Sequence, residues 1–275
     1  MIARVAAEHG RTAQVIVCEG HDLGAAARDA LAAGGLIAAG GGDGTVSAVA
    51  SVVAGSAVPL GVLPMGTLNH FAKDMGIPLD LDSAVRTLFT GVPADVDVGE
   101  VNGRVFVNNS SIGLYPQIVR ERDREQGRGR GRGRGKWVAF AAAIAQVLRR
   151  GVTLHVGVVA DRGIETMLDT PFLFVGNNPY SVTGLEIGKR ARLDCGTLWL
   201  WAAPHANRLT LLGLALGALF GRLSQADLIQ HDLQAVQIHT SRRRMHVTID
   251  GEVTLMRTPL RYRVRPGALR VMVPG

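Results

Sequence analysis

A glycine-rich run at residues 40–45, GGGDGT, is the first place in the chain where residue types and spacing could support chemistry. The run follows an apolar stretch and precedes a helical pattern, and consecutive glycines let backbone N–H groups approach a polyphosphate closely. A carboxylate beside phosphate repels it unless a cation lies between them, so Asp43 would hold Mg²⁺ there. The alternative is a tight turn in which Asp43 only caps the following helix. The pattern therefore indicates a nucleotide site with a metal.

A second turn with similar properties follows the next apolar run. Gly66 would allow close approach of a ligand, and Thr67 and Asn69 carry side chains that can donate hydrogen bonds to phosphate, ribose or base. Because the ends of neighbouring parallel strands meet at one edge of a sheet, we expect the two turns to lie together. A dinucleotide fingerprint does not fit, since Ser47 or Val49 stands where its last glycine should be.

The sequence pattern also predicts the elements that position these turns. It indicates consecutive βα units up to about residue 91 and mostly antiparallel strands after Pro93. In the first half we expect strands at 13–18, 36–39 and 60–63, with helices at 23–33, 46–54 and 68–75. In the second half we expect strands at 96–98, 105–108, 154–159, 171–175, 197–202, 235–240 and 245–249. The prediction is an α/β domain at 1–93 followed by a β domain at 94–275.

Three further segments stand out in the second half. The alternation of arginine and glycine at 127–135 cannot bury apolar area and is expected to be a mobile loop. Apolar helices are expected at 137–150 and 209–223, mainly in the core, with a lipid-facing surface as the alternative.

The charge, the cysteines and the apolar stretches of the chain indicate where the protein acts and what it binds. The chain has 275 residues, a formal net charge of +7 and two distant cysteines without metal-ligand spacing, Cys18 and Cys195. The longest apolar stretch, 209–220, would extend about 18 Å as a helix, against a hydrocarbon core of about 30 Å. We therefore expect a cytoplasmic protein without a transmembrane segment whose partners are anionic.

Taken in order, four motifs resemble the diacylglycerol kinase catalytic family, which includes bacterial soluble lipid kinases and sphingosine kinases. They are GGDGT, PLGVLPMGTLNHFAKDMGIP, VNNSSIGL and IDGE, and the resemblance runs from about Val15 to the carboxyl end. It implies an N-terminal Rossmann-like three-layer α/β nucleotide domain followed by a C-terminal β-sandwich domain, with the active site in the cleft. The implied activity is transfer of the γ-phosphoryl of ATP, with Mg²⁺, to a lipid hydroxyl, diacylglycerol being the default acceptor.

The resemblance also assigns site residues. The implied nucleotide-binding residues are Gly41, Gly42, Asp43, Gly44, Thr45, Gly66, Thr67 and Asn69. The implied catalytic residues are Asp250, Glu252 and Asp43. A carboxylate of the Asp250-Gly251-Glu252 motif is implied to take the proton from the lipid hydroxyl. The implied metal ligands are Asp43 and, at a structural site, Asp194.

The sequence departs from the family pattern in three places. The chain starts inside what should be the helix after the first strand, so we expect that the natural protein begins upstream. His70 stands where the family often has aspartate, and Ser47-Ala48 where it often has Asn-Glu. Cys195 occupies the position of an aspartate in the structural metal site, and a thiol is a poor Mg²⁺ ligand.

Two alternative functions remain. One is an NAD kinase-like enzyme, which shares the GGDGT turn, and the other is a nucleotide- or lipid-binding protein with weakened catalysis. Positive charge in the second half, as at Arg242–Arg244, favours peripheral association with an anionic membrane. Nucleic-acid binding is disfavoured because no aromatic residues interleave with the arginines. A homodimer is left open.

Overall fold

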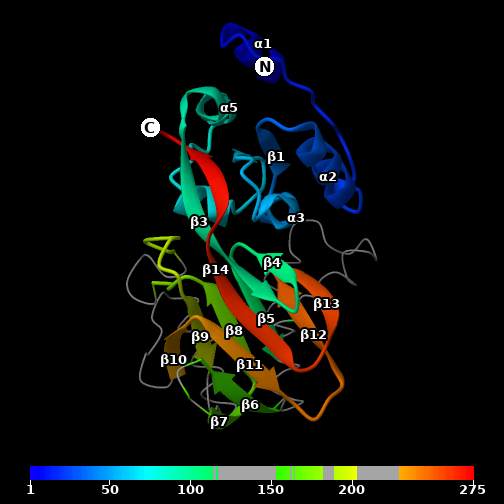
Figure 1. Ribbon diagram of the computed structural model, residues 1–275, viewed down its shortest axis with the longest axis vertical. Helices are drawn as coiled ribbons and strands as arrows, with labels where there is room; N and C mark the ends of the chain where they lie inside the picture. Colours follow the sequence, from blue (N-terminus) through cyan, green and yellow to red (C-terminus); the bar gives the residue numbers. More distant parts are fainter. Residues whose placement is uncertain (114–115, 117–152, 162, 164, 182–188, 203–228) are drawn as a thin grey trace, which may run out of the picture.

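The computed structural model describes residues 1–275 apart from 114–115, 117–152, 162, 164, 182–188 and 203–228. The described helices are α1 (Ile2–Glu8), α2 (Leu23–Ala33), α3 (Asp43–Val53), α4 (His70–Asp74) and α5 (Leu81–Thr90). The described strands are β1 (Ile37–Gly41), β2 (Leu60–Pro64), β3 (Val92–Val101), β4 (Arg104–Phe106), β5 (Asn109–Gly113), β6 (Leu154–Ala160), β7 (Glu165–Thr170), β8 (Phe172–Asn177), β9 (Leu198–Ala202), β10 (Ile229–Leu233), β11 (Ala235–His239), β12 (Arg244–Ile249), β13 (Glu252–Arg257) and β14 (Leu260–Val273). Figure 1 shows the helices gathered at one end of the molecule and most strands at the other.

The helical end contains the predicted βα units. Strands β1 and β2 pair in parallel, from Ile37 opposite Leu60 to Gly41 opposite Pro64. Helix α3 buries Val46, Val49, Ala50 and Val53, whose spacing places them on one face toward the sheet. Helix α5 begins where the Asp80 side chain accepts a hydrogen bond from the Ser83 N–H at 2.9 Å. The predicted order of the helices at 23–33, 46–54 and 68–75 and of the strands at 36–39 and 60–63 is confirmed, whereas α5 was not predicted.

The strand predicted at 13–18 is wrong. These residues have no regular structure, and Val15, Ile16 and Val17 are exposed. Strand β1 pairs only with β2 among the described residues, so the segment has no neighbouring strand with which to form a ladder. A β-branched run remains extended chain when no partner takes its N–H and C=O groups.

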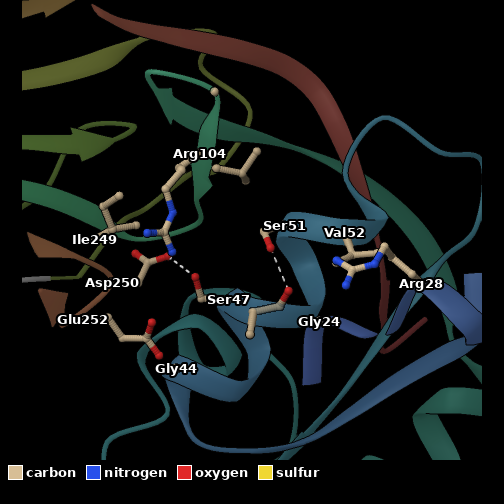
Figure 2. Close-up of a pocket in the computed structure, with 13 residues that line it drawn as sticks. Gly24, Arg28, Gly44, Ser47, Ser51, Val52, Arg104, Ile249, Asp250 and Glu252 are labelled. Atoms are coloured by element: carbon tan, nitrogen blue, oxygen red, sulfur yellow. Dashed lines mark hydrogen bonds between the residues drawn. The ribbon is translucent and has the colours of Figure 1, made fainter. Parts of the chain in front are cut away.

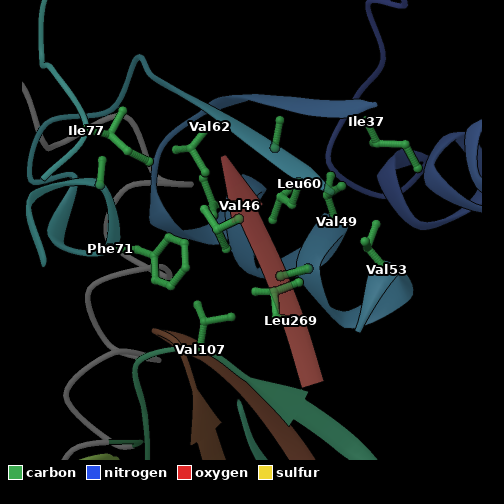
Figure 3. Close-up of a cluster of buried hydrophobic side chains, with 14 of the residues drawn as sticks. Ile37, Val46, Val49, Val53, Leu60, Val62, Phe71, Ile77, Val107 and Leu269 are labelled. Atoms are coloured by element: carbon green, nitrogen blue, oxygen red, sulfur yellow. The ribbon is translucent and has the colours of Figure 1, made fainter. Parts of the chain in front are cut away.

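Strand β14 connects the two ends of the molecule, and Figure 1 shows it running from the β end to the helical end. It pairs antiparallel with β3 along most of its length and parallel with β2 at Val271 opposite Leu60. The register shifts between Arg265 and Leu269. Leu269 is fully buried in the core of the helical end, where Figure 3 shows it beside Val46 and Leu60. Strands β3 and β14 therefore contribute side chains both to the core of the helical end and to the core of the β end, and the boundary at residue 93 stays a prediction.

The β end is a sandwich of two sheets. The first sheet follows the order β1-β2-β14-β11-β6-β7, with β3 on β14 and β4 on β3, and the second follows β10-β9-β8-β5-β12-β13. A second core joins them, with Val156 and Val236 from the first sheet and Leu173 and Leu200 from the second. The predicted strands 154–159, 171–175, 197–202, 235–240 and 245–249 match β6, β8, β9, β11 and β12, whereas β7, β10, β13 and β14 were not predicted.

The single strand predicted at 105–108 is divided in the structure. Strand β4 ends at Phe106 and β5 begins at Asn109. The N–H groups of Val107 and Asn108 between them donate to the Asp250 carboxylate instead of to a neighbouring strand.

The predicted loop at 127–135 and the predicted helices at 137–150 and 209–223 lie outside the described residues. Within the described residues, no helix has the length and apolar character needed to cross a bilayer.

Candidate active site

The two glycine-rich turns meet, as the sequence predicts. The Met65 N–H donates to the Gly41 C=O at 3.0 Å, which joins the ends of β1 and β2. A Cβ atom on Gly66 would strike the Cα of Gly42, and it would lie 3.2 Å from the Gly42 nitrogen. The two backbones are therefore in contact, and only glycine at position 66 permits this approach without movement.

Asp43 is the first residue of α3, and its carboxylate joins the two turns. It accepts hydrogen bonds from the N–H groups of His70 at 3.2 Å and Phe71 at 3.1 Å. Asp43 thus caps a helix, but the helix is α4 rather than its own. A carboxylate bound in this way keeps lone pairs for a cation, and Mg²⁺ bound to a nucleotide needs only one or two carboxylates beside phosphate and water oxygens. The turn therefore fits a magnesium nucleotide.

The polar side chains of the second turn divide between two roles. Asn69 has a left-handed backbone with φ +50°, and its side chain accepts from the Gly66 N–H and donates to the Gly66 C=O, both at 2.9 Å. Its amide thus determines the shape of the turn. The side chain of Thr67 is exposed and faces no partner among the described residues, so Thr67 is the donor available to a ligand. Thr45 packs against Gly41, where a Cβ would collide with its side chain.

Asp250 lies in the turn between β12 and β13 with a left-handed backbone, φ +45°. Its carboxylate accepts hydrogen bonds from Ser47 Oγ at 2.5 Å, from the Val107 and Asn108 N–H groups at 2.8 Å, and from the Asn109 N–H at 2.9 Å. Burial raises the pKa of Asp250, and the four hydrogen bonds oppose that change. With its lone pairs engaged, Asp250 fits an anchoring role better than the predicted role of proton acceptor.

Glu252, two residues later, has the opposite environment. It is exposed, and its carboxylate has no hydrogen-bond or ion-pair partner among the described residues. Its Oε1 lies 3.9 Å from the position that a Cβ on Gly44 would occupy, and Figure 2 shows the carboxylate directed toward Gly44. Glu252 is thus the free carboxylate of the IDGE motif, and it faces the first turn of α3.

A cavity of about 310 Å³ adjoins Glu252. Its walls come from α2, α3, the turn between β3 and β4, and the turn between β12 and β13. In Figure 2, Arg104 and Glu252 lie on one side of the cavity and Arg28 on the other. The cavity is large enough for the polar end of a substrate whose hydroxyl approaches Glu252.

Asp194 does not belong to a cluster of potential metal ligands among the described residues. Its carboxylate accepts from Arg192 Nε at 2.8 Å and Arg192 Nη2 at 3.0 Å, and this ion pair lowers the pKa of Asp194. No cluster of three potential ligands occurs among the described side chains. Asp194 therefore forms a surface ion pair with Arg192, and the metal-binding role implied for it stays a prediction.

Three residues of the site were not predicted. Ser47 departs from the family pattern and from the dinucleotide fingerprint, and neither departure predicts that its hydroxyl donates to Asp250. Arg28 and Arg104 line the cavity, but Arg28 lies in an ordinary helical pattern and Arg104 in a hairpin, so neither offers a recognisable signal. Only the long-range contacts of α2 and β4 bring them to the site.

Comparison with known proteins supports the assignment of these motifs. Residues 2–101 match the family model of the diacylglycerol kinase catalytic domain, and residues 129–273 match that of the YegS C-terminal NAD kinase beta sandwich-like domain. A probable lipid kinase YegS-like protein of Pseudomonas syringae pv. tomato is 32% identical over 90% of this chain and 79% of its own length. One of Pseudomonas aeruginosa PAO1 is 31% identical over 98% of this chain and 87% of its own length.

Among solved structures, a putative diacylglycerol kinase from Bacillus anthracis superposes with a TM-score of 0.76 at 20% identity, covering 99% of this chain and 90% of its own. That likeness concerns the fold. The two domain matches and the relatives above 30% identity show the family as well. The chain belongs to the YegS-like lipid kinase family, with a diacylglycerol kinase catalytic domain followed by a β-sandwich.

Proposed function

We propose that this protein transfers the γ-phosphoryl group of ATP, with Mg²⁺, to the hydroxyl of a lipid, and that diacylglycerol is its first candidate acceptor. The observation that carries the proposal is the position of Glu252, a free carboxylate that faces Gly44 in the turn that matches the family's phosphate-binding motif. A base is needed there, because a hydroxyl must lose its proton as it attacks phosphorus.

Different residues bind the phosphates, hold the metal and accept the proton. Backbone N–H groups of the turn around Gly42 bind the phosphates, Gly66 lets the second turn lie against the first, and Thr67 adds a hydroxyl donor. Mg²⁺, held near Asp43, would neutralise charge on the transferring group. Glu252 accepts the proton of the acceptor hydroxyl, while Asp250 holds the turn that carries Glu252.

The acceptor is expected to come from an anionic membrane surface, where the protein binds peripherally. Arg242, Arg243 and Arg244 are exposed, and Arg244 lies opposite Arg257 in the ladder of β12 and β13. None of these four forms an ion pair within the described residues, so their charge is free to attract acidic headgroups.

The test is transfer of labelled phosphate from Mg-ATP to diacylglycerol, sphingosine, phosphatidylglycerol and NAD, with each lipid presented in neutral and in anionic vesicles. Replacing Glu252→Gln keeps shape and removes the base, so kcat should fall by about 10²- to 10⁴-fold while ATP affinity stays within about twofold. Glu165→Gln, an exposed glutamate on β7, is the matched control and should leave kcat unchanged.

Three results would contradict the proposal. Labelling of NAD instead of any lipid would identify an NAD kinase-like enzyme. ATP binding without a labelled product would identify a binding protein. Full activity of Glu252→Gln would exclude Glu252 as the proton acceptor.

A further inference from the structure

Arg190 is a cation buried between the two ends of the molecule, and its guanidinium bonds to groups from both of them. Its side chain is 0% exposed. Nε donates to the Asp74 carboxylate at 2.8 Å, Nη1 donates to the Val107 C=O at 2.7 Å and the Asn177 C=O at 3.1 Å, and Nη2 donates to Asn108 Oδ1 at 2.7 Å. Nη2 also forms an ion pair with the Asp74 carboxylate at 2.8 Å. The guanidinium thus makes four hydrogen bonds, more than the three N–H groups of a lysine could provide.

On one side, Arg190 anchors the helix that follows the second glycine turn. Asp74 is the last residue of α4, and its side chain is 6% exposed. The first N–H groups of α4, those of His70 and Phe71, bind Asp43. Helix α4 is therefore held at both ends, by Asp43 at its start and by Arg190 at its finish.

On the other side, Arg190 holds the segment 107–109, which joins β4 to β5. The carbonyl and amide oxygens of this segment face Arg190, while its N–H groups face the Asp250 carboxylate. Tyr180 supports the same segment, since its hydroxyl donates to the Asn108 C=O at 2.9 Å and its ring lies 5.2 Å from the Arg190 guanidinium carbon.

These contacts form a closed circuit around the candidate active site. From Asp43 the circuit passes through α4 to Asp74, through Arg190 to segment 107–109, and on to Asp250. It returns through the hydrogen bond of Ser47 to Asp250, because Ser47 lies in α3, the helix that begins with Asp43. No contact in this circuit depends on a bound ligand.

We propose that Arg190 is a positioning residue that, with Asp74, sets the place of the Glu252 turn relative to the two nucleotide turns. A buried ion pair is a weak source of stability, since an apolar pair of similar volume is often as stable. What an apolar pair cannot do is bind α4 and segment 107–109 in one fixed geometry. Misplacing a reacting group by about 1 Å can cost about 10²-fold in rate.

The inference rests on the proposed kinase activity for its kinetic test. The main variant combines Arg190→Met with Asp74→Leu, which removes both charges and keeps an apolar fill. Its control combines Arg270→Met with Asp95→Leu, an ion pair of similar geometry that joins β14 and β3 on the surface. We expect kcat of the main variant to fall at least tenfold with the KM for ATP within about twofold, and kcat of the control to stay unchanged. Arg190→Lys, which keeps the charge without the fork, should also lower kcat.

A second readout does not require activity. The N–H groups of Val107, Asn108 and Asn109 donate to Asp250, so their hydrogen exchange should be at least tenfold faster in the main variant and in Arg190→Lys, and unchanged in the control. Unchanged exchange, or unchanged kcat in folded enzyme, would overturn the inference. If the wild type phosphorylates no lipid, the proposed function fails, and the exchange rates still decide whether Arg190 holds this segment.

Discussion

Replacing Gly66 by alanine tests whether contact between the two glycine turns shapes the nucleotide site. The new Cβ would lie 2.8 Å from Asn69 Oδ1 and 3.2 Å from the Gly42 nitrogen, and it would strike the Gly42 Cα. Carbon contacts are favourable at about 3.5–4.0 Å, so the turns must separate by roughly 1–1.5 Å. Overpacking of this kind costs about 1–3 kcal/mol. If that cost falls on the nucleotide complex, it corresponds to about 5- to 150-fold in affinity.

The assay combines urea unfolding without nucleotide and titration with Mg-ATP. Gly66→Ala should lower the free energy of unfolding by about 1–3 kcal/mol or weaken ATP binding by the factor given above. Gly42→Ala is the matched comparison for stability, because its Cβ would lie 3.4 Å from the Gly66 Cα, and it should cost less than about 1 kcal/mol. Wild-type stability and wild-type ATP affinity in Gly66→Ala would refute the reasoning.

Two further predictions concern the core and the buried carboxylate. Leu269→Ala should lower the free energy of unfolding by about 2–5 kcal/mol in urea titrations, because Leu269 is 0% exposed, whereas Leu255→Ala, at a 51% exposed site, should change it little. An equal effect at both sites would contradict the assigned packing. Burial raises the pKa of Asp250, so as pH rises the native state keeps the proton on this carboxyl to a higher pH than the unfolded state does. The free energy of unfolding of the wild type, relative to that of Asp250→Asn, should therefore fall with rising pH. Urea unfolding from pH 4 to 8 checks the sign, and a rise would show that the four hydrogen bonds outweigh burial.

The sequence predicts most of the helical end because its signals are local. Helix α2 matches its predicted bounds of 23–33, and the turns at 40–45 and 64–69 lie at strand ends that pair in register. Apolar spacing, strand length and glycine position are all readable within about ten residues. The convergence of the two turns follows from parallel pairing alone.

The features that were not predicted depend on contacts between distant parts of the chain. Strand β14 contains Pro266-Gly267 in its middle, which reads as a turn, yet the chain continues through a register shift to Leu269. The role of Asp250 depends on segment 107–109, whose amides have no sequence signature as donors. Arg190 lies in a basic run, KRAR, that gives no sign of burial.

The pairing of Val271 with Leu60 also has a consequence for the order of folding. The core around α3 lacks Leu269 and Val271 until residue 271 has been synthesised, so the helical end cannot complete its packing while its first 100 residues leave the ribosome. Closing so long a loop is slow compared with forming local helices. Chaperones would therefore meet a nascent chain that already contains both glycine-rich turns but in which β2 lacks its neighbour β14.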